Sequence, residues 1–248
     1  MIAAAIDARQ PKPGAEHNAF LALVLLVWLG VVTGFGTDSY DHVRHHGLDY
    51  PLIVHLHAVA FVSYLVLFTN QVLLVRRGRV HLHRRLGPWI AVLASVMVVV
   101  GPATALIVHA RAYAASGETP EFLAVQLTDI VAFATLTGAG WLLRGVTSAH
   151  KRLMLLGLIY ISDAGFARWL DPILAAPLGD TRLGEFVSLY GCSDALMVSL
   201  GLYDLVARRR LHLAWIGAAI LYLTLELVAV TLLHSTAWEA FSLHLIGR

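Results

Sequence analysis

The sequence predicts an all-α integral membrane protein, a bundle of seven transmembrane helices with a cytoplasmic N-terminus. Of its 248 residues, 58% are hydrophobic and only 14% are charged, whereas about 25% of the residues of soluble domains are charged. The mean hydropathy is +0.72. The apolar residues form long runs, and about 20 apolar residues in a helix cross the hydrocarbon core. The basic residues gather in short clusters between alternate runs, as the topology of a multi-pass membrane protein requires.

Seven apolar segments are long enough to cross a membrane. They span residues 18–36, 52–75, 88–112, 122–144, 152–170, 184–207 and 212–235. The first segment is expected to remain as a helix, because no small-residue cleavage site follows it. Residues 1–17 are then a cytoplasmic N-terminal segment, 18–235 the transmembrane domain, and 236–248 a short external tail. Gly101 and Pro102 are expected to kink the third span.

The basic residues predict the orientation. Thirteen of the 18 lie in the N-terminal segment and in the second, fourth and sixth connections. The positive-inside rule places these parts, and with them the N-terminus, in the cytoplasm and the C-terminus outside. Contact with anionic headgroups is enough to explain the clusters, and the net charge of +2 does not indicate nucleic-acid binding. The single cysteine excludes an intrachain disulfide and, within one chain, a Cys-based zinc or iron–sulfur site.

The stretch VHLH occurs twice, from Val54 and from Val80. A continuous helix would separate the two copies by about 39 Å, more than the roughly 30 Å of the hydrocarbon core. The copies therefore lie on opposite sides and cannot share one ion. Paired histidines at two depths are typical of a transmembrane cytochrome. Heme b would then have two pairs of histidine ligands. The outer pair would be His57 and His109, and the inner pair His83 and His150. The alternative is that these histidines lie at the interface and cap helices.

The second span carries a polar stripe. His57, Tyr64 and Gln71 recur every seven residues, so they share one helix face. Polar groups in a membrane turn away from lipid, because an unsatisfied polar group there is costly. This face is expected to line the interior of the bundle.

Each of the last four spans contains an acid: Asp129, Asp163, Asp194 and Glu226. A charge at the bilayer centre costs at least about 2.5–3.5 kcal/mol, so these side chains are expected to face each other, a cation or water. Tyrosines lie one turn from three of the acids, namely Tyr160, Tyr190 and Tyr222.

Two interpretations of the acids remain open. The first is a polar cavity, open to the outside, that serves proton transfer or binds a cation, a polar substrate or a divalent metal. The metal ligands would be His57, Asp129, Asp163 and Asp194, a mixture of imidazole and carboxylate donors. The second is a structural role, with acids bonded to the tyrosines and Asp163 offset by Arg168.

Short motifs in the middle of the chain resemble a family of bacterial multi-pass membrane proteins of unknown function. Over residues 52–172 they are, in order, His57, Gln71, HRRLG at 83–87, SAHKRLM at 148–154 and Arg168. The resemblance implies an inner-membrane location and no established activity. The placement of the histidines is also loosely similar to that in di-heme cytochrome b proteins.

Three functions follow as hypotheses. The first is redox or proton-coupled chemistry at the intramembrane polar site, with an electron-transfer or membrane-complex partner. The second is transport of a small solute or ion that uses the acids as coupling sites. The third is a non-catalytic assembly subunit. The sequence has no HExxH, GxSxG or P-loop motif, so it does not indicate a metalloprotease, a serine hydrolase or an ATP-driven transporter.

Overall fold

The computed structural model describes residues 13–179 and 181–248, and within them it is built from nine helices without strands. Most of the predicted N-terminal segment, residues 1–12, lies outside the described residues. The helices are α1 (Pro13–His46), α2 (Leu52–Arg76), α3 (Val80–Ser116), α4 (Leu123–Leu142), α5 (Thr147–Tyr160), α6 (Asp163–Ala175), α7 (Arg182–Arg208), α8 (Leu213–Leu233) and α9 (Thr236–Leu245). The predicted all-α class is confirmed.

Six of these helices, namely α1, α2, α3, α4, α7 and α8, are long and apolar enough to cross a membrane. The pair α5 and α6 passes the same test when taken together, with a bend of 40° between the two helices. The chain therefore has the character of a multi-pass membrane protein, with six spans, or seven if the bent pair is one span. Many large apolar side chains on the outer faces are exposed, among them Val59, Val99 and Ile220, which indicates contact with lipid.

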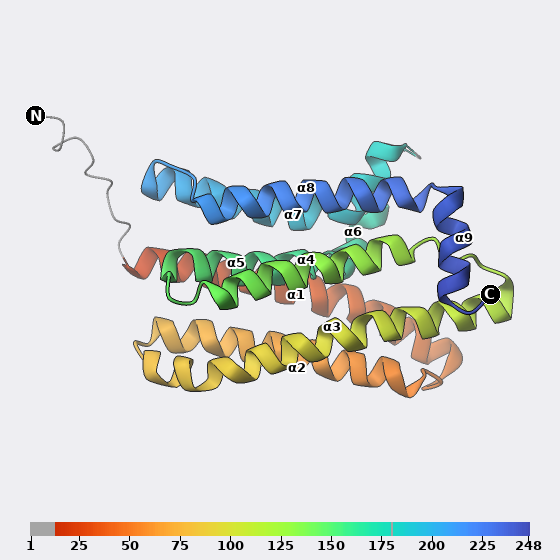
Figure 1. The fold of residues 1–248 in the computed structure, drawn as a ribbon, viewed down its shortest axis with the longest axis horizontal. Coiled ribbons are helices and arrows are strands. Elements are labelled where there is room, and N and C mark those ends of the chain that lie inside the picture. The colour runs from red at the N-terminus through yellow and green to blue at the C-terminus, as the bar shows by residue number, and fades with distance from the viewer. Residues whose placement is uncertain (1–12, 180) are drawn as a thin grey trace, which may run out of the picture.

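The helices lie roughly along one axis, so the bundle has two ends (Figure 1). We call one of them the basic end. It holds the start of α1 and the arginine-rich turns between α2 and α3, α4 and α5, and α7 and α8. At the opposite end, α9 runs across the axes of the other helices (Figure 1). The predicted tail 236–248 thus contains a helix.

The third span is continuous, because α3 runs through both Pro88 and Pro102. The kink expected at Gly101 and Pro102 stays a prediction. The fifth predicted span is interrupted at Ile161 and Ser162, where the sequence has no proline. The predicted segment 152–170 is therefore two helices, each shorter than the hydrocarbon core is thick.

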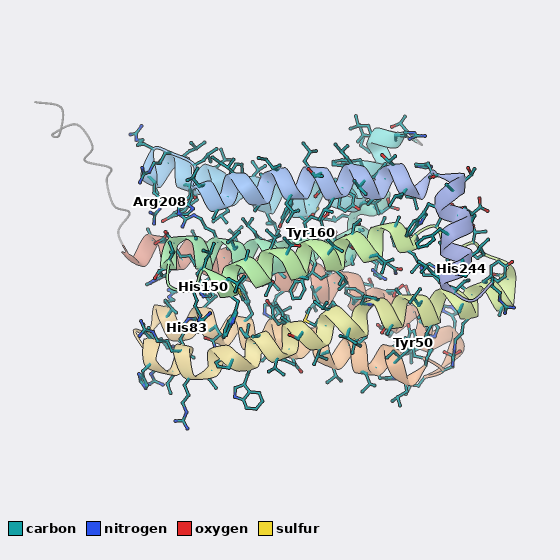
Figure 2. All side chains as sticks on the ribbon, viewed as in Figure 1. Tyr50, His83, His150, Tyr160, Arg208 and His244 are labelled. Atoms are coloured by element: carbon teal, nitrogen blue, oxygen red, sulfur yellow. The ribbon has the colours of Figure 1, made fainter. Side chains whose placement is uncertain are left out.

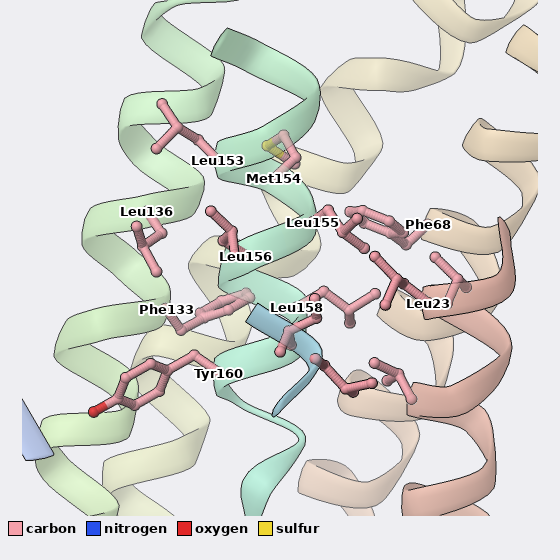
Figure 3. Close-up of a cluster of buried hydrophobic side chains, with 14 of the residues drawn as sticks. Leu23, Phe68, Phe133, Leu136, Leu153, Met154, Leu155, Leu156, Leu158 and Tyr160 are labelled. Atoms are coloured by element: carbon pink, nitrogen blue, oxygen red, sulfur yellow. The ribbon is translucent and has the colours of Figure 1, made fainter. Parts of the chain in front are cut away.

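Helix α5 is buried on all its faces. Its residues from Leu153 to Tyr160 are all buried, as expected of a helix that is apolar all round. Figure 3 shows Leu153 and Leu156 on the side of α4, and Leu155 beside Phe68 of α2. The other helices are arranged around this core.

Glycines allow α1 to approach α6 closely. A Cβ atom at Gly34 would lie 1.9 Å from the carbonyl oxygen of Gly165, and one at Gly30 would lie 2.6 Å from the ring of Phe166. Small residues four apart are a common way to bring helix backbones together in membranes. This contact fixes the position of α6, and with it the first residue of α6, Asp163.

We predict that Gly34→Ala destabilises the bundle, whereas Gly36→Ala does not. A methyl group at position 34 meets backbone, so the two helices must separate, and overpacking of this kind costs about 1–3 kcal/mol. A methyl group at position 36 has no heavy atom within 4 Å. Both changes gain the same helix propensity, so the difference between their unfolding midpoints in detergent isolates the contact. Equal midpoints would show that α6 does not depend on this approach.

Candidate functional site

The break between α5 and α6 brings an acid into the middle of the bundle. Tyr160, the last residue of α5, lies about midway along the bundle axis (Figure 2). Asp163 begins α6, and its carboxylate accepts a hydrogen bond from the backbone N–H of Ala164. The N-terminus of a helix carries a partial positive charge that favours a nearby anion. Broken helices at mid-membrane are a recurring way to present such a terminus to a site.

Four acids from four helices meet at this level. We call Asp129 of α4, Asp163 of α6, Asp194 of α7 and Glu226 of α8 the carboxyl cluster. The carboxyl groups of Asp129 and Asp163 lie within hydrogen-bonding reach of each other, as do those of Asp194 and Glu226. Glu226 also lies close enough to Asp129 and Asp163 to act on both electrostatically. Asp129, Asp163 and Glu226 are buried, and Asp194 is half-buried.

Each carboxyl pair needs a proton or a cation between its members. An ionised carboxylate can only accept hydrogen bonds, so two of them in contact repel each other unless one carries a proton. Among the described residues, none of the four acids forms an ion pair with Lys, Arg or His. One oxygen of each acid is also buried without a hydrogen-bond partner in the part of the chain that the structure describes.

Three buried tyrosines surround the cluster. The rings of Tyr160 and Tyr222 meet edge to face at 4.5 Å, and Tyr190 lies 6.4 Å from Tyr160. Tyr222 donates its hydrogen bond to the carbonyl of Leu156 and not to Glu226, one turn away. The hydroxyl of Tyr160 points away from the apolar core (Figure 3) and lies near Asp129, Asp163 and Glu226, without a hydrogen-bond partner among the described residues. The expected tyrosine–acid hydrogen bonds are therefore not formed within the cluster.

Apolar side chains separate the cluster from the opposite end of the bundle. Val125, Ala229 and Val230 pack on Tyr190, and Phe186, Leu189 and Leu233 pack around them. These residues lie one or more turns beyond the acids on α4, α7 and α8. The side chains next to the acids on that side are mostly apolar, with Gln126 and the buried Ser188 as polar exceptions. The polar cavity open to the outside stays a prediction.

Polar contacts also join the helices at the opposite end. The Nε1 of Trp238 in α9 donates to the carbonyl of Glu121, at 2.9 Å. Glu185 of α7 and His234, which follows α8, are 2.6 Å apart.

The residues of the predicted polar stripe occupy different environments. Tyr64 and Gln71 are buried, and the Tyr64 ring meets the Phe133 ring edge to face at 5.3 Å. His57 is half-buried and stacks on Phe61, with ring centroids 4.0 Å apart.

The structure gives no metal-ligand set. Within residues 13–179 and 181–248, no group of three or more His, Cys, Asp or Glu side chains is arranged to hold a metal ion. The predicted ligands Asp129 and Asp163 meet, whereas His57 has Phe61 as its stacking partner. Arg168, predicted to offset Asp163, lies over the ring of Phe35 and 3.6 Å from Asp38 of α1. It makes no ion pair with Asp163 among the described residues, but it lies near enough to act on Asp163 electrostatically.

The inner pair of predicted heme ligands meets at the basic end. The rings of His83 and His150 are 6.2 Å apart, at an interplanar angle of 72°, and Figure 2 shows the two residues near each other. The Nδ1 of His150 lies 2.8 Å from the carbonyl oxygen of Gly140 and donates to it, which leaves Nε2 available. In the outer pair, His109 bonds instead to the side-chain oxygen of Gln126, at 3.0 Å.

A buried ion network at the basic end escaped the sequence analysis. Arg152 of α5 and Asp204 of α7 are both fully buried, and the guanidinium contacts the carboxylate with two nitrogens. Glu16 of α1 adds bonds to Lys151, at 2.7 Å, and to Arg208, at 2.9 Å. Headgroup contact was the expected role of these basic residues, and for Arg152 it is wrong, because its charge is satisfied inside the protein. The signal in the sequence was an acid close to two of the basic clusters, Glu16 near Lys12 and Asp204 near Arg208.

We predict that Arg152→Met destabilises the fold by about 3–5 kcal/mol, because it leaves the buried Asp204 carboxylate without its main partner. Arg152→Met combined with Asp204→Leu should recover most of the loss, since no buried charge then remains. Arg210→Met, in the exposed turn after α7, is the matched control and should change little. Chemical unfolding in detergent measures all three. If Arg152→Met behaves like Arg210→Met, the network does not stabilise the bundle.

A cavity of about 410 Å³ lies away from the carboxyl cluster, between α4, α5 and α8 towards the basic end. Its lining is mostly apolar, and His212 is its one titratable residue. Burial and then the nearby Arg152 lower the pKa of His212, whose Nδ1 accepts the N–H of Ala214 at the start of α8. The cavity therefore offers no polar group to the cluster.

Comparisons of the chain with protein-family models, curated proteins and solved structures found no match.

Proposed function

We propose that this chain is an inner-membrane protein, with its basic end in the cytoplasm, that takes up and releases protons at the carboxyl cluster in the course of a coupled transport or redox reaction. The observation that carries the proposal is the meeting of four carboxyl groups in two pairs, without a cationic partner, in the middle of the bundle.

The carboxyl cluster differs from the other buried acid of the bundle, Asp204, which has a cationic partner. Where a buried acid holds helices together, at Asp204, it is matched by a fully buried arginine in bidentate contact. Intramembrane acids with no such partner commonly belong to ion pathways and proton relays. The carboxyl cluster has acids on four helices and no arginine or lysine in contact within the described residues, so a purely structural role does not account for it.

The geometry also favours protons as the species that moves. Two carboxyl groups in contact share a proton readily, because one donates and the other accepts. Because the two carboxyl pairs also lie near each other, a second proton can move from one pair to the other without a large change in structure. An assembly subunit would have no need of this arrangement, since neutral polar groups would join the helices at lower cost.

Infrared spectroscopy of the reconstituted protein tests the proposal. At neutral pH, when exposed carboxyl groups are ionised, wild-type protein is expected to show the C=O stretch of protonated carboxyl groups, because each pair holds a proton. Asp129→Asn and Glu226→Gln should each remove part of that band. Glu118→Gln, in the exposed connection before α4, is the control and should leave the band unchanged. A wild-type spectrum without the band rejects the proposal.

A second candidate is electron transfer through a heme at the basic end. One observation favours it: His83 and His150 come from different helices to a ring separation of 6.2 Å, and His150 has its Nδ1 fixed by a backbone carbonyl, as metal-ligating histidines usually do. A heme needs only two protein ligands.

An absorbance spectrum of the purified protein, oxidised and then reduced with dithionite, tests this candidate. A bound heme gives Soret and α bands, and His150→Ala should remove them. His109→Ala, whose ring bonds to Gln126, is the control and should retain them. Protein purified from heme-replete cells without these bands excludes the candidate.

A further inference from the structure

Most of the buried polar atoms without a hydrogen-bond partner in the described part of the chain fall into two groups, and the others belong to His57, Ser188, Tyr203 and Arg208. One group is the carboxyl cluster with Tyr160 and Tyr190. The other lies in the half of the bundle towards the basic end, between α2, α3, α4 and α5. Its atoms are the Tyr64 hydroxyl, both polar atoms of the Gln71 amide, the Thr137 hydroxyl and the Nδ1 of His83. More than nine in ten buried polar groups are normally paired, with protein or with ordered water, so a run of exceptions needs a reason.

The second group is spread from the basic end to mid-bundle, with Phe68 between Gln71 and Tyr64 on α2. His83 meets His150 at the basic end, and its ring lies beside the backbone carbonyl of Gln71. Gln71 and Tyr64 share one face of α2, being seven residues apart. The hydroxyl of Tyr64 lies near that of Thr137 on α4. We call Gln71, Tyr64 and Thr137 the polar strip.

One aromatic ring separates the strip from the cluster. Phe133 is fully buried, and the Tyr64 ring packs against it. On α4 it lies one turn from Thr137 on one side and one turn from Asp129 on the other, so Thr137 and Asp129 are about 12 Å apart along the helix. The strip therefore ends about two helical turns short of the cluster, with the Phe133 ring between them.

Towards the opposite end the cluster meets Tyr190 and then a mostly apolar layer, formed by Val125, Ala229 and Val230 with Phe186, Leu189 and Leu233 around them. Ser188, between Phe186 and Leu189 on α7, is a buried polar residue on this side. A proton crosses an apolar layer of that kind poorly, because each unsatisfied charge in it is costly. The two sides of the cluster are thus chemically different.

We infer that the polar strip is the path by which protons reach the carboxyl cluster, that it opens at the basic end beside His83 and His150, and that Phe133 is its gate. The inference rests on the proposed function of the cluster. Gln71 and Thr137 hold the water molecules through which protons pass, and neither needs to gain or lose a proton itself, because amides and hydroxyls both donate and accept hydrogen bonds.

The test is the rate at which the cluster's protonated-carboxyl band shifts when reconstituted protein is transferred from H₂O to D₂O. Gln71→Leu and Thr137→Val should each slow the shift roughly tenfold, the effect of a barrier raised by one lost hydrogen-bonding step. A substitution that merely destabilised the protein would have the opposite effect, because local opening of the bundle speeds hydrogen–deuterium exchange. Slower exchange therefore indicates a blocked path.

Two matched controls complete the experiment. Thr224→Val removes a hydroxyl that faces lipid on α8 and should leave the rate unchanged. Gln126→Leu removes an amide on the side of the opposite end, where Gln126 bonds to His109, and should also leave it unchanged.

The outcomes separate the two proposals. A missing band rejects the proposed function itself. A band that is present and shifts at the wild-type rate in Gln71→Leu and Thr137→Val overturns the path and leaves the cluster standing. A rate that falls in Gln126→Leu alone places the path at the opposite end and likewise overturns the inference.

Discussion

A carboxyl group inside a membrane bundle must have a cation, a proton or a hydrogen-bond donor, and this requirement organises the molecule. At the basic end the requirement is met by Arg152, whose guanidinium binds Asp204 across α5 and α7. Glu16 extends the network to α1. At mid-bundle the four acids of the carboxyl cluster lie near each other and near tyrosines, and the Ala164 N–H is the one donor outside the cluster that hydrogen-bonds to them among the described residues. Under the proposed function, protons meet the rest of the requirement. One end of the bundle is thus held by fixed charges, and its middle can change its charge.

The position of the cluster depends on backbone packing as much as on the acids. Asp163 reaches the interior because the fifth span breaks at Ile161 and Ser162 and a new helix starts there. That short helix stays in place through the contact of Gly165 with Gly30 and Gly34 of α1. A larger residue at Gly34 would push the start of α6 away and carry Asp163 out of reach of Asp129. The glycines therefore determine the position of Asp163 without contacting the carboxyl cluster.

The sequence was sufficient for features that depend on local pattern, and insufficient for those that depend on pairing. Runs of apolar residues predict spans because length and hydropathy are local. Helix α9 was missed because it is too short to be a span, and the break after Tyr160 was missed because no proline marks it. The acids were recognised from their depth alone. Arg152 was misjudged because counting basic residues assigns each one to the interface, whereas its partner Asp204 lies 52 residues away in the chain and becomes its neighbour only through folding.

The two sides of the carboxyl cluster differ in a way that bears on any coupled mechanism. A site that binds protons from one side only can store them; to do work it must also pass them on or give them to a second reaction. The apolar layer of Val125, Val230 and Leu233 closes one route, and the half-buried Asp194 is the member of the cluster with access to the protein surface. Asp194 pairs with Glu226, and Glu226 lies near Asp129 and Asp163. If the proposed function holds, the order of the acids would give the cluster an entrance at Asp129 and an exit at Asp194, on different helices.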